Sequence, residues 1–114
     1  MTKEIAIRNI NKALGLNLNL TNTNWSNINS NGKWSIEPNR DRRHQKLYLL
    51  LNNNHSNKIH VFEIPANHDV YDKLYIRNDR NVYRLLFDIS DNEFIEKLKH
   101  INFINFYKGF IDYN

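Results

Sequence analysis

The sequence of 114 residues contains no cysteine, which excludes disulfides, iron–sulfur clusters and zinc sites built from thiolates. Glycine is also scarce. The three glycines stand far apart at Gly15, Gly32 and Gly109, so no glycine-rich loop can cradle a phosphate. This excludes the P-loop, kinase and dinucleotide-binding classes. No stretch approaches the roughly 18 consecutive apolar residues of a membrane span, so we expect no membrane partner.

The patterns that mark enzyme active sites are missing as well. The five histidines show no metal-binding spacing, and neither Glu37 nor Glu63 stands in the Glu-x-Lys pattern of restriction-type nucleases. No serine lies in a Gly-x-Ser-x-Gly setting. We therefore expect no catalytic residue, no metal and no cofactor, and the sequence favours a non-catalytic protein. Charges within residues 1–15 exclude a signal peptide, so a cytoplasmic location is expected.

The positive charge of the chain is concentrated in its first half. The net charge is +4, and residues 1–46 carry eight basic and three acidic side chains. Residues 88–114 carry three basic and five acidic ones. The densest basic segment is "EPNRDRRHQK", residues 37–46. Such an excess on one segment is expected of a surface that faces nucleic acid, although a solvated loop before a strand would show the same composition.

Residues 2–15 predict an amphipathic helix, because Thr2 suits an N-cap, Gly15 suits the residue after the last turn, and apolar residues recur between them at helical spacing. Residues 16–20 alternate as a short edge strand would, and residues 21–32 are expected to form a loop. Further strands are predicted at residues 33–37, 46–51, 58–64, 73–77 and 82–89.

The C-terminal region has the pattern of helices. Ser90 and Glu93 fit a capping box, and Phe103, Phe106, Tyr107 and Phe110 follow one another at i, i+3, i+4 and i+7. The resulting prediction is a single α+β domain over residues 1–114. It has an N-terminal helix, an antiparallel sheet of four to six strands built from two hairpins, and a C-terminal helix or helices.

The strand pairing follows from alternation. In the first hairpin we expect Leu51 to pair with Ile59, and in the second we expect Ile76 to pair with Tyr83. One face of the second hairpin is then apolar. The opposite face carries a basic and aromatic strip made of Tyr75, Arg77, Val82 and Arg84.

These features favour a non-catalytic DNA-binding module, of the kind that serves as the specificity domain of a restriction or defence protein. DNA is favoured over RNA as the partner. Basic side chains would hold phosphates, and the two tryptophans would lie near bases, although Trp34 also suits a strand core and Trp25 suits packing on the core. The candidate contacts are Arg40, Arg42, Arg43, His44, Lys46, Trp25, Trp34, Arg77, Arg80 and Arg84.

Two alternatives remain open. The chain could be a small phage or mobile-element inhibitor that binds a host protein. The segment "YIRNDRNVYRLLFDISDNEF", residues 75–94, resembles the paired strands of RelE-type toxins, which cleave messenger RNA without a metal. That resemblance implies Arg77, Arg80 and Arg84 as phosphate contacts.

Overall fold

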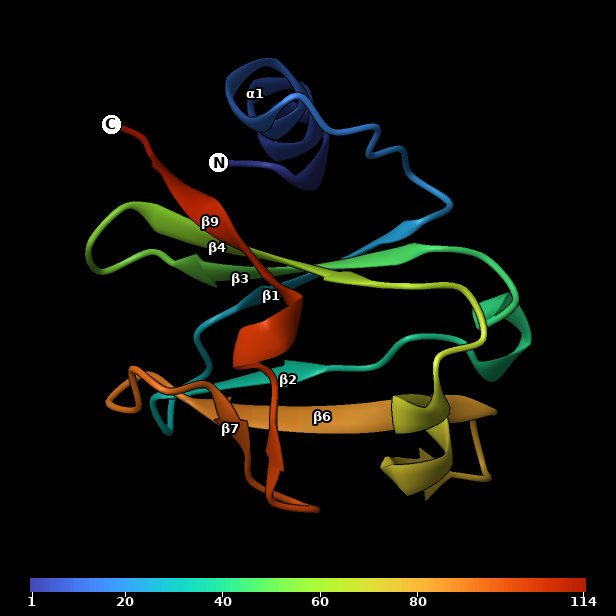
Figure 1. Cartoon of the computed structure of the whole chain (residues 1–114). Helices are drawn as coiled ribbons and strands as arrows, with labels where there is room; N and C mark the ends of the chain where they lie inside the picture. Colours follow the sequence, from blue (N-terminus) through green and yellow to red (C-terminus); the bar gives the residue numbers. More distant parts are fainter.

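The protein is built from three layers, as Figure 1 shows. The computed structural model describes all 114 residues. A single α-helix, α1, covers one face of a four-stranded sheet, and a three-stranded sheet covers the other face. A separate two-stranded ladder lies near the smaller sheet. No helix in the structure is long and apolar enough to cross a membrane.

Helix α1 spans Lys3–Leu14 and has the predicted ends. The Thr2 side chain accepts a hydrogen bond from the Ile5 backbone N–H, and Gly15 follows the helix in the left-handed conformation. Ala6 and Ile10 are fully buried against the sheet. The predicted N-terminal helix is therefore confirmed.

The strands form a sandwich with an unusual first pairing. The larger sheet has the order β1-β3-β4-β9, and the smaller one has the order β2-β6-β5. Strand β1 pairs with β3 in parallel, whereas every other pair is antiparallel. The strands are β1 (Thr23–Asn27), β2 (Lys33–Ile36), β3 (Leu47–Asn53), β4 (Lys58–Ile64), β5 (Tyr75–Arg77), β6 (Val82–Asp88), β7 (Ile95–Glu96), β8 (Ile101–Asn102) and β9 (Tyr107–Asp112). Three short 3-10 helices connect them: η1 (Arg40–Arg42), η2 (Asp69–Lys73) and η3 (Ile104–Phe106).

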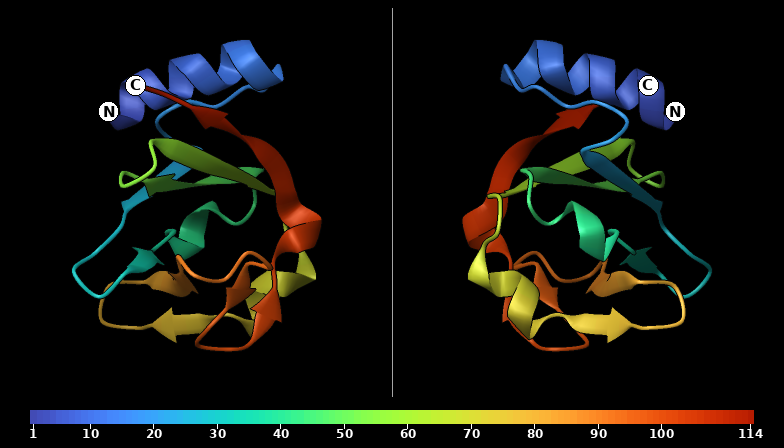
Figure 2. Two further views of the ribbon diagram at one scale, coloured as in Figure 1. Left: turned by 90° about the vertical axis from the view of Figure 1, so that its left-hand side faces the viewer. Right: turned by 90° about the vertical axis from the view of Figure 1, so that its right-hand side faces the viewer.

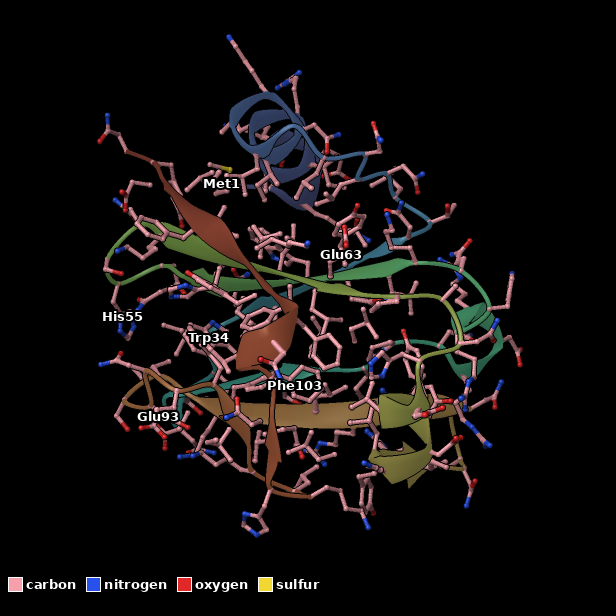
Figure 3. The ribbon with its side chains drawn as sticks, viewed as in Figure 1. Met1, Trp34, His55, Glu63, Glu93 and Phe103 are labelled. Carbon is pink, nitrogen blue, oxygen red and sulfur yellow. The ribbon has the colours of Figure 1, made fainter.

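Both faces of the larger sheet are buried, so the molecule has two cores. Leu49, Leu51 and Phe62 face the smaller sheet, while Leu50 and Val61 face α1. The sequence run "LYLLL" in β3 is apolar at successive positions for this reason, as is typical of a strand covered on both sides. Figure 3 shows Trp34 and Phe103 between the two sheets, and Glu63 on the helix-facing side.

The predicted fold class is wrong. The chain is mostly β, with nine strands in three sheets, and it has no C-terminal helix. The two predicted hairpins exist, but they belong to different sheets that pack face to face. Residues 21–32, expected to be a loop, contain β1, whereas residues 16–20 form no strand.

Side-chain carboxylates explain why residues 90–102 do not form a helix. Asp91 accepts the backbone N–H groups of Glu93 and Ile95, and Glu96 accepts three further backbone N–H groups. Helix hydrogen bonds cannot form where side chains already hold those donors. The Ser90 hydroxyl donates to Asp88 rather than capping a helix.

A β-bulge explains the helix-like spacing of the last aromatic residues. The register between β4 and β9 shifts at Lys108, which lies between Tyr107 and Gly109. Tyr107 and Phe110 therefore both reach the His60 ring from the same face of β9, although they are three residues apart. A spacing that is typical of a helix is here produced by a bulged strand.

The register of the first hairpin differs from the prediction by one residue. Leu51 pairs with His60, and Asn52 pairs with Ile59. The register of the second hairpin is confirmed, because Ile76 pairs with Tyr83. The strip formed by Tyr75, Arg77, Val82 and Arg84 lies on the outer face of the smaller sheet, since the alternate residues of β6 are in the core.

His60 is the centre of an aromatic cluster between the sheets. Its ring centroid lies 5.0–6.4 Å from those of four rings, and its Nδ1 lies 2.9 Å from the Tyr107 hydroxyl oxygen. Burial, assisted by the nearby Lys58 cation, lowers the pKa of His60 to about 4. The folded protein therefore holds this imidazole neutral. The four rings belong to Trp34, Phe94, Tyr107 and Phe110.

This pKa predicts a loss of stability in mild acid. The unfolded chain protonates His60 near pH 6.5 and the folded chain only near 4, so the free energy of unfolding should fall between these values, by about 1–2 kcal/mol for this half-buried group. We expect His60→Phe to lose that part of the pH dependence in urea titrations at pH 7 and 4.5. The exposed His55 supplies the control, His55→Phe. Equal pH dependence in His60→Phe and the unmodified protein would contradict the assignment.

Candidate nucleic-acid interface

The basic segment 37–46 packs against the turn of the second hairpin. Asn39 forms a β-bridge with Val82, and the Arg40 backbone N–H donates to the Asn81 carbonyl oxygen at 3.1 Å. The Asn81 side-chain amide also donates to the Asp41 carboxylate at 3.1 Å. The loop that contains η1 and the turn 78–81 therefore form one edge of the molecule, which we call the basic edge.

Carboxylates neutralise two of the arginines at this edge. Arg43 donates to Asp72 at 2.9 Å and to the Tyr83 hydroxyl at 3.1 Å, and its guanidinium lies over the Tyr71 ring. The hydrogen bond with Asp72 raises the pKa of Arg43. These contacts tie the loop to η2 and β6, so Arg43 is a structural residue.

Arg77 is engaged in the same way. It donates to Asp79 at 3.1 Å and to Glu37 at 2.9 Å, and these bonds raise its pKa. The matching hydrogen bond lowers the pKa of Asp79. Two of the predicted phosphate contacts, Arg43 and Arg77, thus already have anionic partners within the chain.

Three arginines at the basic edge have no carboxylate close enough to neutralise their positive charge fully. Arg40 has no carboxylate within ion-pair distance, and Arg80 reaches Glu37 only at 3.9 Å with 64% of its side chain exposed. Arg42 donates to a carbonyl oxygen, that of Thr21, at 2.6 Å. A cation bonded to a neutral oxygen retains its full charge, and the contact of Arg80 with Glu37 is long, so these three side chains are the least neutralised arginines of the basic edge.

Lys3 extends the same edge and was missed by sequence reasoning. Its ammonium donates to the Leu20 carbonyl oxygen at 3.3 Å, next to the Thr21 carbonyl that Arg42 uses. Partial burial lowers the pKa of Lys3, and the Arg42 cation adds to this effect while Glu4 opposes it. Residues 3 and 42 are too far apart in the sequence for any local pattern to reveal that they bind neighbouring carbonyl groups.

The remaining basic candidates lie at the margins. The His44 Nδ1–H donates to the Asp41 carbonyl oxygen at 2.7 Å. Lys46 lies 3.8 Å from Glu63, which Lys108 of β9 also contacts. Arg84 is on the outer face of the smaller sheet opposite Tyr75; it has no carboxylate partner, and its buried Nε makes no hydrogen bond.

Neither tryptophan belongs to the basic edge. Trp34 is 2% exposed, and its indole N–H donates to the Asn52 carbonyl oxygen at 2.9 Å, which joins the two sheets. Trp25 is half-buried in β1 and packs against the core beneath α1. Of the two interpretations for each tryptophan, the structure supports core packing.

A cleft of about 540 Å³ is lined by residues of η2, of η3 and of the strands β4, β8 and β9. In the right-hand view of Figure 2, the yellow segment that contains η2 lies below the green η1 and the red η3. The lining of the cleft combines two lysines, Lys73 and Lys108, with two acidic residues and two amides. These are Asp69, Glu63, Asn102 and Asn105. No sequence motif marks these residues, which come from five separate elements and loops.

Comparison with protein-family models, with curated proteins and with solved structures found no match for this chain. Within the structure, no three histidine, aspartate or glutamate side chains lie close enough together to hold a metal ion. The interpretation of the basic edge and the cleft therefore rests on their geometry and charge.

Proposed function

We propose that the protein is a non-catalytic DNA-binding module that holds the phosphate backbone at its basic edge. The observation that supports this proposal is the meeting of the two basic segments at the Arg40–Asn81 hydrogen bond, which gathers Arg40, Arg42 and Arg80 on one edge. A role as the specificity domain of a restriction or defence protein, in the cytoplasm, belongs to the same proposal.

Cations without carboxylate partners are what phosphate binding requires. An arginine already paired with a carboxylate gains little from a phosphate, because the new contact must displace the old one. Arg40 and Arg42 carry no such cost, and Lys3 adds a fourth positive charge beside Arg42. The basic edge therefore offers up to four phosphate contacts, which come from the start of α1, the loop with η1 and the turn 78–81.

The test replaces Arg40, Arg42 and Arg80 together by alanine. If each removes one phosphate contact, the slope of log affinity against log salt should decrease by about 3, and affinity at about 50 mM salt should fall by about 30- to 100-fold. The measurement is fluorescence anisotropy with a labelled duplex across a salt series. Gel electrophoresis of the incubated DNA and of RNA reports nuclease activity, which the RelE resemblance would imply.

A matched control carries the same loss of charge elsewhere. Arg8, Lys12 and Lys99 are exposed and have no carboxylate within ion-pair distance, so Arg8→Ala/Lys12→Ala/Lys99→Ala has the same net charge. We expect this variant to bind DNA almost as well as the unmodified protein. If both triple variants bind equally, the basic edge is not the DNA-binding surface.

A second candidate function, binding to a host protein as an inhibitor, is favoured by the free edge of β5. Strand β5 pairs only with β6, and Tyr75 and Ile76 are 44% and 36% exposed there. Unpaired backbone groups beside exposed apolar side chains can accept a strand from a partner. Capture of a host protein that survives nuclease treatment and is lost in Ile76→Lys would support this function over DNA binding.

A further inference from the structure

We infer that the cleft beside the basic edge holds one unpaired base of a DNA strand and prefers bases with an exocyclic amino group. This inference rests on the proposed function, because it requires the strand to be held at the basic edge. The cleft is of a size that suits a small organic ligand, and its lining includes η2, which contacts the basic loop.

Helix η2 connects the two sites directly. Its Asp72 bonds Arg43 of the basic loop at 2.9 Å, and the Asn67 backbone N–H just before it donates to the Arg43 carbonyl oxygen at 2.7 Å. Three other residues of η2, Asp69, Val70 and Lys73, line the cleft. One short helix therefore both contacts the basic loop and forms part of the wall of the cleft.

Two aromatic rings, those of His68 and Phe106, form part of the cleft lining. Phe106 is half-buried in η3, and its ring meets the His68 ring edge-on at 5.0 Å between centroids. The His68 Nδ1 accepts the Val70 backbone N–H at 2.9 Å, which places the ring proton on Nε2. Every base has a π-face that can pack on such rings, and this contact does not depend on the identity of the base.

The polar groups of the cleft provide the preference among bases. Asp69 is exposed and has no cation within ion-pair distance, so its carboxylate can accept the amino group of cytosine, adenine or guanine. The Asn105 amide makes no hydrogen bond within the chain, and Asn102 uses only its oxygen, for the Ile104 backbone N–H. Thymine has no amino group and would leave Asp69 without a partner.

The charges at the cleft suit the phosphate that accompanies a base. Lys73 is exposed and unpaired, whereas Lys108 and Lys46 share the single carboxylate of Glu63, at 3.5 and 3.8 Å. That trio carries one net positive charge. Asp69 lies in the first turn of η2, and its exposed carboxylate can accept a hydrogen bond from a donor group on the ligand.

The test compares single strands dC12 and dT12 with a mixed-sequence duplex of 12 base pairs. We expect the unmodified protein to bind dC12 about fivefold more tightly than dT12. In Asp69→Ala/Asn105→Ala the affinity for dC12 should fall to that for dT12. Its affinity for dT12 and for the duplex should stay the same or rise slightly, because a negative charge is lost.

The matched control is Glu93→Ala/Asn92→Ala, which changes the same kinds of exposed side chains away from the cleft. It should leave the ratio of dC12 to dT12 affinities unchanged. Equal binding of dC12 and dT12 by the unmodified protein, or an unchanged ratio in the cleft variant, overturns the inference.

Failure of this inference can be distinguished from failure of the proposed function. If the triple arginine variant loses DNA binding while the cleft variant still prefers dC12 over dT12, the proposed role of the basic edge is supported and the base site is wrong. If the triple variant binds all three DNAs as before, the proposed function fails, and with it the placement of a base in the cleft.

Discussion

Replacing Glu96 by glutamine is expected to lower the free energy of unfolding by about 3 kcal/mol. The Glu96 side chain is fully buried, and no cation lies within ion-pair distance of it. One oxygen accepts the backbone N–H groups of Leu86 and Leu98 at 2.8 and 3.0 Å, and the other accepts that of Lys99 at 2.8 Å. A glutamine amide would turn an NH₂ group toward one of these donors, which leaves a buried N–H without an acceptor. Urea unfolding followed by fluorescence measures the effect.

Glu93 provides the control for this prediction. It lies in the same region of the chain, is exposed, and its carboxylate accepts no hydrogen bond. Glu93→Gln should therefore change the free energy of unfolding by less than about 0.5 kcal/mol. A similar loss in both variants would show that charge, rather than the three hydrogen bonds, makes Glu96 important. The same slope against urea in all three proteins would show that the unfolded states are comparable.

Replacing Trp34 by alanine should have a larger effect, a loss of about 3–5 kcal/mol. Trp34 fills the space between the two sheets, and its indole N–H bonds the Asn52 carbonyl oxygen of β3. The variant would leave a cavity beside the His60 cluster and a buried carbonyl group without a donor. Because domains of this size are stable by only about 5–15 kcal/mol, Trp34→Ala could leave part of the protein unfolded at 25 °C.

Two further variants separate packing from binding at this position. Trp25→Ala removes the same kind of side chain from a half-buried site and should cost only about 1–2 kcal/mol. Trp34→Phe keeps most of the packing, remains folded, and should bind DNA with unchanged affinity. A loss of DNA affinity in folded Trp34→Phe would contradict the assignment of Trp34 to the core.

Patterns among neighbouring residues predicted those helices and strands whose caps and pairing partners lie close to them in the sequence. The Thr2 and Gly15 caps and the apolar spacing between them identify α1, and alternation identifies β2, both hairpins and the register of the second hairpin. The first hairpin was placed one residue out of register, because its turn is rich in asparagine and gives no single residue that fixes the pairing. Strand β1 was missed because its partner β3 lies more than twenty residues away and its own sequence is polar.

Contacts between residues far apart in the sequence determine the secondary structure of the C-terminal region and the charge pairing in most of the candidate site. Phe103 to Phe110 follow a helical spacing, but the open edge of β4 binds this segment as β9, and the bulge at Lys108 turns Tyr107 and Phe110 to one face. The charge count identified the basic edge. It could not show which arginines are paired within the chain, because Arg77 with Glu37 and Arg43 with Asp72 are contacts across 40 and 29 residues.

The position of β9 has a consequence for how the chain folds during synthesis. Its residue Ile111 completes the apolar surface on which α1 rests, yet α1 is made first and β9 last among these elements. Until residues 107–112 leave the ribosome, the outer edge of β4 is unpaired and the apolar surface that α1 covers is incomplete. Contacts between such distant segments are slow to form, so we expect folding in milliseconds to seconds rather than microseconds. A nascent chain halted before β9 would expose that edge to other chains.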